Sequence, residues 1–133
     1  MAPTEILAKQ HYNLAKKIFS SSINIKILTG KTKSNERKII LNELSSGKID
    51  LLIGTHSLFQ EKIKYHKLGL IVIDEQHKFG VKQRKKLSDK AGNNCDVLVM
   101  SATPIPRTMI MTIYGDMDVS VIKSKPKNRK EIK

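Results

Sequence analysis

Apolar residues recur at helical spacing in two segments of the chain. In residues 4–19 the apolar positions include Ile6, Leu7, Leu14, Ala15 and Ile18. In the second segment they are Ile39, Ile40 and Leu44. Side chains three or four residues apart share one face of a helix, so we predict a helix in each segment. Thr4 is the expected cap of the first helix, and Ser34 is the expected cap of the second, which should end near Gly47.

Short apolar runs lie between and after these segments. They occupy residues 23–28, 49–53, 68–73 and 97–100. Each has the length of a buried strand and ends in small or polar residues. Strands that alternate with helices build a parallel sheet with helices on both faces, and such sheets bind ligands at the carboxyl ends of their strands. The predicted fold class is therefore α/β. A basic helix near residues 81–90, a turn at 91–94 and a Lys-rich tail at 123–133 complete the pattern.

Composition adds a preference for a polyanionic partner. The chain has 133 residues, the size of one small domain, and its 28% of charged residues is ordinary for a globular protein. Its 25 Lys and Arg outnumber 12 Asp and Glu, which leaves a net charge of +13. Nucleic acid is the leading candidate partner, although a merely soluble basic surface is equally compatible with this charge.

Cysteine usage and hydropathy argue against two further classes of protein, those held together by disulfides or thiolate metal clusters and those that span a membrane. Cys95 is the single cysteine of the sequence, so this chain can form neither an internal disulfide nor a thiolate metal cluster. A reducing cytoplasm is the expected compartment. The sequence has no stretch of about eighteen apolar residues and no basic, then apolar, N-terminal signal, so we expect no membrane partner.

The strongest chemical signal is an apolar strand that ends in two adjacent carboxylates. Residues 70–73 read Leu-Ile-Val-Ile, and Asp74, Glu75, Gln76 and His77 follow. Nucleotide hydrolysis needs such a pair, because an Asp can hold Mg²⁺ through its waters while the neighbouring Glu deprotonates the water that attacks the γ-phosphate. An acidic surface turn is the alternative interpretation. The apolar strand that precedes the two carboxylates favours the catalytic interpretation.

A second motif follows the next predicted strand. Ser101, Ala102 and Thr103 come directly after residues 97–100. The imidazole of His77 could bond one of these hydroxyls and so link the state of the nucleotide to the position of a strand. The same hydroxyls could instead cap a helix that starts at Pro104. The two interpretations are compatible.

Together the two motifs resemble motifs II and III of superfamily 2 helicases. Residues 1–8, 53–58, 77–81 and 101–108 further resemble the RecG family of ATP-dependent DNA helicases, and the similarity spans essentially the whole chain. The transcription-repair coupling factors share the segments at residues 54–56 and 102–108. Gln76 and residues 114–120 are similar to the RecG pattern and unlike that sister family.

The resemblance implies the first RecA-like motor domain of a helicase, of the P-loop NTPase class and truncated at its N-terminus. It implies ATP and Mg²⁺ as cofactors. The implied partners are branched or forked DNA duplex and the remaining helicase domains of a longer parent chain. That parent would couple ATP hydrolysis to duplex translocation and to the remodelling of replication forks and recombination intermediates.

The resemblance also assigns roles to individual residues. The implied catalytic residues are Asp74, Glu75, Gln76 and His77, with Asp74 holding Mg²⁺ through water. The implied coupling residues are Ser101, Ala102, Thr103 and Arg107. The implied contacts to the DNA backbone are Thr4, Gln10, His11, Thr29, Gly30, Gly54, Thr55 and His56. A Gly or Thr between a strand end and a helix start exposes backbone N–H groups to phosphate oxygens. A simple turn is the favoured interpretation of Thr29-Gly30 taken alone, and Arg107 could be a solvated helix residue.

Two parts that the resemblance requires are not in this sequence. A Gly-rich loop that ends in Gly-Lys-Thr should precede the first motif, but Gly30-Lys31-Thr32 only imitates it, because Ile25 stands where a glycine is needed. The second motor domain is also missing. We therefore expect residues 1–122 to be a partial ATP-binding domain, 123–133 to be a linker, and Met1 to mark a truncation.

The missing phosphate-binding loop and second motor domain determine which activity we expect of this chain. The chain alone should hydrolyse no ATP. A basic DNA-binding module with a vestigial acidic motif is the alternative of a different class. A metal hydrolase with Asp74, Glu75 and His77 as ligands is disfavoured, because adjacent side chains of a strand end point in opposite directions.

Overall fold

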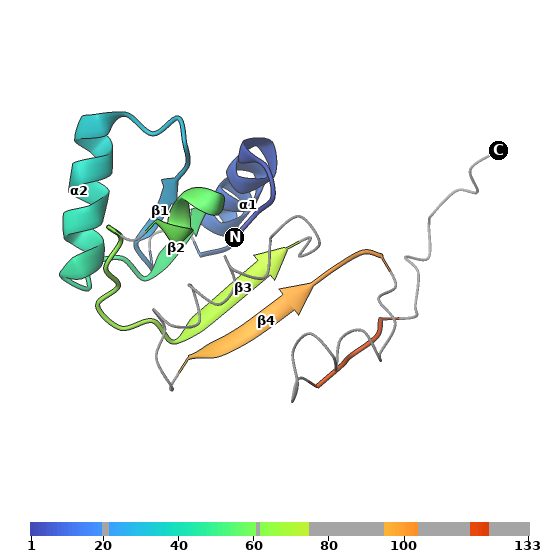
Figure 1. The fold of residues 1–133 in the computed structure, drawn as a ribbon. Helices are drawn as coiled ribbons and strands as arrows, with labels where there is room; N and C mark the ends of the chain where they lie inside the picture. Colours follow the sequence, from blue (N-terminus) through green and yellow to red (C-terminus); the bar gives the residue numbers. More distant parts are fainter. Residues whose placement is uncertain (20–21, 61, 75–94, 104–117, 123–133) are drawn as a thin grey trace. The chain divides into compact units, whose positions relative to one another are not determined.

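The computed structural model describes residues 1–19, 22–60, 62–74, 95–103 and 118–122. The chain divides into two compact units, Met1–Ala102 and Thr103–Lys133. The helices and strands named below all belong to the first unit (Figure 1). The described residues of the second unit form neither helix nor strand. The predicted basic helix at 81–90, the turn at 91–94 and the tail at 123–133 lie outside the described residues.

The first predicted helix is confirmed as α1, Glu5–Phe19. The hydroxyl Oγ1 of Thr4 accepts the backbone N–H of Leu7 at 3.3 Å, so Thr4 caps this helix as expected. Glu5 in the first turn and basic side chains in the last turn have the signs that the helix dipole favours. Cap and charge therefore agree with the prediction. The predicted apolar face does not, because Ile6, Leu14 and Ile18 are 71%, 56% and 64% exposed and the helix packs through Ala8 and Ala15.

The second helix is α2, Ser34–Ser45, and the prediction that Ser34 caps it is wrong. Lys33 holds the cap position without a side-chain hydrogen bond, and its carbonyl accepts the N–H of Arg37 at 2.8 Å. The backbone therefore enters the helix one residue earlier than a Ser cap would allow. The predicted end near Gly47 is confirmed, because Gly47 adopts a left-handed φ of 73°.

The four predicted strands are all present. They are β1, Ile25–Leu28; β2, Leu51–Gly54; β3, Leu70–Asp74; and β4, Asp96–Met100. A short 3₁₀ helix, η1, His56–Phe59, follows β2. β1 pairs with β2 in parallel, with Leu28 opposite Gly54, and β3 pairs with β4 in parallel, with Asp74 opposite Met100. The predicted parallel α/β class is confirmed.

The described strands form two two-stranded sheets, β1-β2 and β3-β4, where a single sheet was expected. Met1 and Ala2 lie between them. The amine of Met1 donates to the carbonyl of Val72 at 2.6 Å, and the N–H of Asp74 donates to the carbonyl of Met1 at 3.0 Å. The N–H of Ala2 donates to the carbonyl of Gly54 at 2.9 Å. These two residues connect the sheets but are too few to form a strand of their own.

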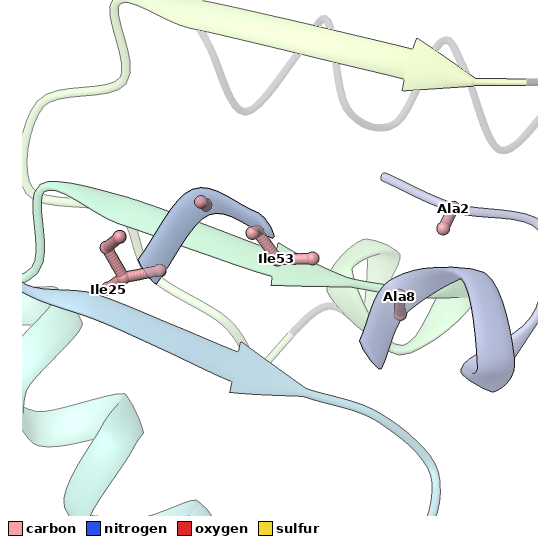
Figure 2. Close-up of a cluster of buried hydrophobic side chains, with 5 residues drawn as sticks. Ala2, Ala8, Ile25 and Ile53 are labelled. Carbon is pink, nitrogen blue, oxygen red and sulfur yellow. The ribbon is translucent and has the colours of Figure 1, made fainter. Parts of the chain in front are cut away.

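α1 and α2 cover opposite faces of the β1-β2 sheet. The cluster under α1 consists of Ala2, Ala8, Ala15, Ile25 and Ile53 (Figure 2). The cluster under α2 consists of Leu28, Ile40, Leu44, Leu58 and Ile63. Ile25 and Leu28 belong to different clusters because alternate residues of a strand face opposite sides of the sheet. The prediction of helices on both faces therefore holds.

A third buried cluster lies beside η1 and β3. It consists of Phe59, Ile71 and Ile73. Ile73 is 2% exposed, so the residue that precedes Asp74 is held in the core. Within the described residues, no helix has both the length and the apolar character needed to cross a membrane.

Candidate functional site

The parallel pairings gather the predicted site residues at the carboxyl ends of the strands. Because Leu28 lies opposite Gly54, the segments that start at Thr29 and Thr55 leave the β1-β2 sheet at the same edge. Because Asp74 lies opposite Met100, the motif that begins at Ser101 starts beside the tip of β3. This is the edge at which an open parallel sheet binds ligands.

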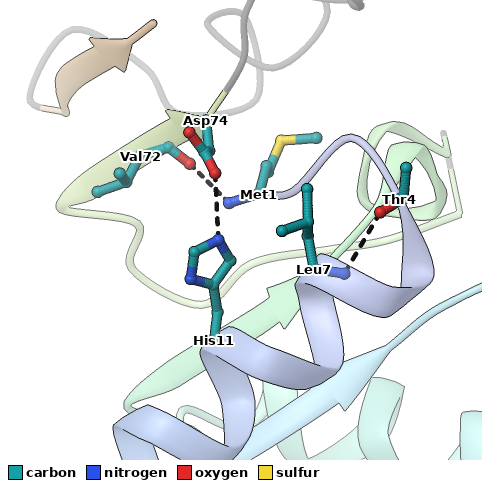
Figure 3. Close-up of polar contacts among 6 residues, drawn as sticks. All are labelled: Met1, Thr4, Leu7, His11, Val72 and Asp74. Atoms are coloured by element: carbon teal, nitrogen blue, oxygen red, sulfur yellow. Dashed lines mark hydrogen bonds and ion pairs between the residues drawn. The ribbon is translucent and has the colours of Figure 1, made fainter. Parts of the chain in front are cut away.

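The side chain of Asp74 at the tip of β3 contacts α1. Its Oδ2 accepts a hydrogen bond from Nε2 of His11 at 3.1 Å (Figure 3). The two side chains are 24% and 43% exposed, so the contact lies at the margin of the core. The buried side chain of Ile73 holds the end of β3 in the core, and the capped start of α1 sets the position of His11. The carboxylate is thereby held by two separate elements.

The amine of Met1 also lies close to Asp74 (Figure 3). Burial lowers the pKa of this ammonium below its ordinary value, and the charge of Asp74 partly opposes that effect. Asp74 therefore lies near one amine and one imidazole. A partly exposed carboxylate is a hard oxygen donor, which suits a divalent cation held through water.

Only some of the other predicted catalytic and coupling residues lie in the described part of the chain. Glu75, Gln76, His77 and Arg107 lie outside the described residues. Ser101 is half-buried and Ala102 is exposed in the first unit, whereas Thr103 belongs to the second unit. The contact between His77 and the hydroxyl motif stays a prediction. Within the described ranges, no cluster of three or more His, Cys, Asp or Glu side chains is arranged to hold a metal.

Four of the predicted DNA contacts are exposed: Thr4, Gln10, Gly30 and His56. The loop after β1 lies against the start of α1, because Nζ of Lys31 is 3.3 Å from Oε2 of Glu5. The first turn of α1 and the Gly30 loop therefore form one continuous surface. His11 is the exception among the helix residues, since its ring is engaged with Asp74.

Three further predicted DNA contacts, Thr29, Gly54 and Thr55, are buried. Thr29 is 5% exposed, its hydroxyl accepts the N–H of Lys31 at 3.3 Å, and its own N–H donates to Oγ1 of Thr32 at 3.0 Å. These bonds support the simple-turn interpretation of Thr29-Gly30. Thr55 is 2% exposed, so it could reach a phosphate only through its backbone. Lys31 is directed at Glu5, which supports the view that Gly30-Lys31-Thr32 is no phosphate loop.

Gly54 has a packing role that the sequence did not indicate. A Cβ atom at this position would lie 2.2 Å from the carbonyl oxygen of Leu28 and 3.0 Å from Cγ of Leu58. The neighbouring Ser57, 1% exposed, donates its hydroxyl to the same carbonyl at 2.9 Å. Ser57 was not among the predicted site residues, and its place directly after Gly54-Thr55-His56 is only a weak sequence signal for this hydrogen bond.

Comparison with known proteins agrees with this arrangement. The model of the DEAD/DEAH box helicase family matches residues 1–112. The chain is 52% identical over 132 residues to ATP-dependent DNA helicase RecG of Staphylococcus aureus (strain NCTC 8325 / PS 47), and 51% identical over 132 residues to that of Streptococcus pneumoniae serotype 4 (strain ATCC BAA-334 / TIGR4). In both cases the match covers 99% of this chain and 19% of the relative.

A solved structure of RecG bound to a three-way DNA junction has the same fold. It superposes with a TM-score of 0.78 at 46% sequence identity, over 99% of this chain and 17% of that one. The predicted RecA-like α/β fold and the predicted similarity to RecG are therefore confirmed. The family match includes both the tip of β3 and the hydroxyl motif after β4. The chain belongs to the DEAD/DEAH box helicase family.

Proposed function

We propose that this chain is part of a RecG-like ATP-dependent DNA helicase that remodels branched DNA, and that it carries the metal-binding and water-activating side of the ATP site. The observation that carries the proposal is the contact between His11 and Asp74. It joins a helix that would grip DNA to a strand tip that would sense the nucleotide. The identity of 52% to a RecG helicase supports the assignment of the parent activity.

The proposed cofactors are ATP and Mg²⁺. Helicases of this family use ATP with a divalent metal, and a carboxylate oxygen at a strand tip suits Mg²⁺ held through water. Asp74 would hold the metal, which when bound neutralises charge on the phosphate oxygens. Glu75 would orient and deprotonate the attacking water. Ser101 and Ala102, beside the tip of β3, would report nucleotide state to the DNA-facing surface together with Thr103.

The proposed partner is branched or forked duplex DNA. Thr4 and Gly30 lie on the continuous surface formed by the start of α1 and the loop after β1, and a helix start favours phosphate binding. A net charge of +13 supports a polyanionic partner, and the similar RecG structure was solved on a three-way DNA junction. A bacterial cytoplasm is the proposed compartment, in keeping with a single unpaired cysteine.

His11 would couple the two ligands. It lies two turns into α1, downstream of the DNA-facing Thr4, and its ring contacts Asp74. A shift of Asp74 on nucleotide binding would therefore be felt by α1, and a shift of α1 on DNA binding would be felt by Asp74. Such reciprocity is what allosteric coupling between two binding sites requires.

The test is the substitution Glu75→Gln in a full-length protein that carries this sequence. ATP binding should persist, while hydrolysis should fall by about 10²–10⁴-fold, the usual contribution of a general base. Glu36→Gln makes the same chemical change on the exposed side of α2 and should leave both unchanged. Undiminished hydrolysis by the Glu75 variant would refute the proposed role.

The 133-residue chain provides a second test, because it contains no phosphate-binding loop. We expect no DNA-stimulated ATP hydrolysis from it. A purely basic DNA-binding module would bind DNA with a steep salt dependence, without regard to Mg-ATP and unaffected by Asp74→Ala. Titration of labelled duplex and forked DNA with the full-length protein, with and without Mg-ATP, distinguishes that alternative from a motor.

A further inference from the structure

The segment that leads from η1 to β3 carries a row of exposed basic side chains. Ile63, which is 2% exposed, belongs to the cluster under α2, and the half-buried Tyr65 packs against that cluster. The hydroxyl of Tyr65 donates to the carbonyl of Leu58 at 3.1 Å. The segment is therefore fixed by its apolar residues, while its basic residues are exposed to solvent: Lys62, Lys64, His66 and Lys67.

α2 lies beside this segment and adds further cations. Near the start of the helix, the guanidinium of Arg37 donates to Oε1 of Gln60 at 2.6 Å. After the end of the helix, Gly47 lies against the ring of His66, since an added Cβ would be 2.9 Å from Cδ2 of that ring. Helix and segment therefore lie along each other at both ends (Figure 1). Lys38 and Lys48 are exposed next to these two contacts. We call the joint surface the α2 basic face, and its cations are Arg37, Lys38, Lys48, Lys62, Lys64 and Lys67.

The carboxylates of this region are engaged elsewhere. Glu43 on α2 pairs with Lys26 of β1 at 3.2 Å. Glu36 lines a cavity beside β1, together with Lys26. Asp50 accepts the backbone N–H of Asn24 at 2.8 Å. Within the described ranges, no Asp or Glu forms an ion pair with a cation of the α2 basic face. The face therefore keeps a positive charge that attracts polyanions.

The chemistry of the face favours the phosphate backbone of duplex DNA over an acidic protein. Protein partners are usually held by buried aromatic or aliphatic anchors. In the described part of the chain, no large apolar side chain is exposed in residues 62–69, and the exposed Ile39 of α2 lines the cavity beside β1. All cations of the face except Arg37 are lysines, which meet phosphates as point charges and read no bases. Single strands are held by stacking on exposed aromatic rings, whereas the ring of Tyr65 is half-buried.

We propose that the α2 basic face is a second contact surface for duplex DNA, which holds phosphates of one arm of a branched substrate without reading its sequence. The inference rests on the proposed DNA-binding role and adds a surface to the one that contains Thr4 and Gly30. Arg37 and Gly47 are ten residues apart, so the face follows about 15 Å of helix. With a rise of about 3.4 Å per base pair, that length corresponds to about four or five base pairs.

The experiment measures the salt dependence of DNA affinity, with a full-length protein that carries this sequence and labelled forked DNA in the absence of nucleotide. Each neutralised phosphate contributes about 0.9 to the slope of log K against log salt concentration, so Lys62→Gln/Lys64→Gln should reduce the slope by about 1.8. Its affinity at 0.1 M salt should fall at least about tenfold. The control Lys16→Gln/Lys17→Gln removes the same charge from the last turn of α1 and should keep the slope and affinity of the parent.

A second variant and a series of DNA lengths locate the contact. Lys38→Gln/Lys48→Gln removes two cations from the helix side of the same face and should reduce the slope by a similar amount. The arms of the fork are then shortened one at a time by five base pairs. Shortening one of them should weaken binding by the parent, but not by Lys62→Gln/Lys64→Gln, which has already lost the contacts to that arm.

The rate of ATP hydrolysis distinguishes this inference from the proposed motor function. At saturating DNA, Lys62→Gln/Lys64→Gln should reach the maximal rate of the parent, and only the DNA concentration that gives half of that rate should rise. If the parent showed the predicted slopes but hydrolysed no ATP, the motor function would be refuted and the DNA contact would be supported.

Three results would overturn the proposal. The first is a slope for Lys62→Gln/Lys64→Gln equal to that of the Lys16→Gln/Lys17→Gln control. The second is an equal response of parent and variant to every shortened arm. The third concerns a partner of another class and uses a labelled oligo-glutamate peptide. If the Lys62→Gln/Lys64→Gln variant lost affinity for this peptide but kept the slope of the parent on DNA, the face would be assigned to an acidic protein segment.

Discussion

The substitution Gly54→Ala separates two reasons for a glycine at the tip of β2. Close approach of a DNA phosphate to the backbone is one, and close packing of β1 against β2 is the other. The structure favours packing, because an added Cβ would lie 2.2 Å from the carbonyl oxygen of Leu28. A carbon and a carbonyl oxygen in contact are ordinarily about 3.3 Å apart, so one backbone would have to move by about 1 Å.

The cost of that movement can be bounded. Overpacking by one carbon usually destabilises a core by about 1–3 kcal/mol. Here the obstructing atom belongs to the paired strand and also accepts the hydroxyl of Ser57, so it cannot move aside as a flexible side chain would. We therefore expect about 3 kcal/mol for Gly54→Ala. In a domain of this size that corresponds to a fall in Tm of about 12 °C.

Thermal unfolding followed by circular dichroism at 222 nm measures this effect. The matched control is Gly69→Ala, since an added Cβ there meets nothing within 4 Å. The control should remain within about 3 °C of the parent. If Gly54→Ala matched Gly69→Ala in Tm and lost only DNA affinity in the full-length protein, the packing explanation would be wrong and phosphate approach would be the reason for the glycine.

Three further predictions follow from single contacts. Gly47→Ala should lower the free energy of unfolding by about 1–2 kcal/mol in urea titrations, because the φ of 73° is unfavourable for a side chain, and a loss below 0.3 kcal/mol would contradict this. Burial raises the pKa of Tyr65 from 10.0 to about 12, so its contribution to stability is complete below pH 10 and declines as pH rises from 10 to 12. Tyr65→Phe should remove that part of the alkaline decline, and identical pH profiles of the two proteins would refute it. In the full-length protein, His11→Ala should lower DNA-stimulated ATP hydrolysis about fivefold through loss of the contact with Asp74, while Asn13→Ala on the same helix should not, and equal rates would argue against coupling through α1.

Local signals along the chain predicted most of the secondary structure. The apolar spacing and Thr4 together located α1, because a side-chain cap acts within one turn of its own residue. The four strands were found because strands of parallel sheets are short, continuous apolar runs. The predicted burial of residues 97–100 is wrong, since β4 is mostly exposed. Ser34 failed as a cap because two neighbouring residues could both start the helix, and the backbone of Lys33 adopted that role.

The candidate site was predictable only in part. Asp74 was found because a carboxylate at the end of an apolar strand is visible in the sequence. Its contact with His11 was not, because the two residues are 63 positions apart and no local pattern connects them. The packing of Gly54 and the burial of Thr55 were likewise not predictable. A glycine that makes room for a ligand cannot be distinguished in the sequence from one that makes room for a neighbouring strand.

By itself, the sequence determined the parallel α/β class, the order of the elements, and the acidic motif at the tip of a buried strand. These properties follow from periodicity and from residue chemistry, which act over a few neighbouring positions. Only the tertiary structure decided which strand edges are paired, which side chain contacts Asp74, and why Gly54 has no side chain. Those outcomes depend on contacts between residues that the chain brings together only when it folds, and single-sequence patterns do not specify such distances.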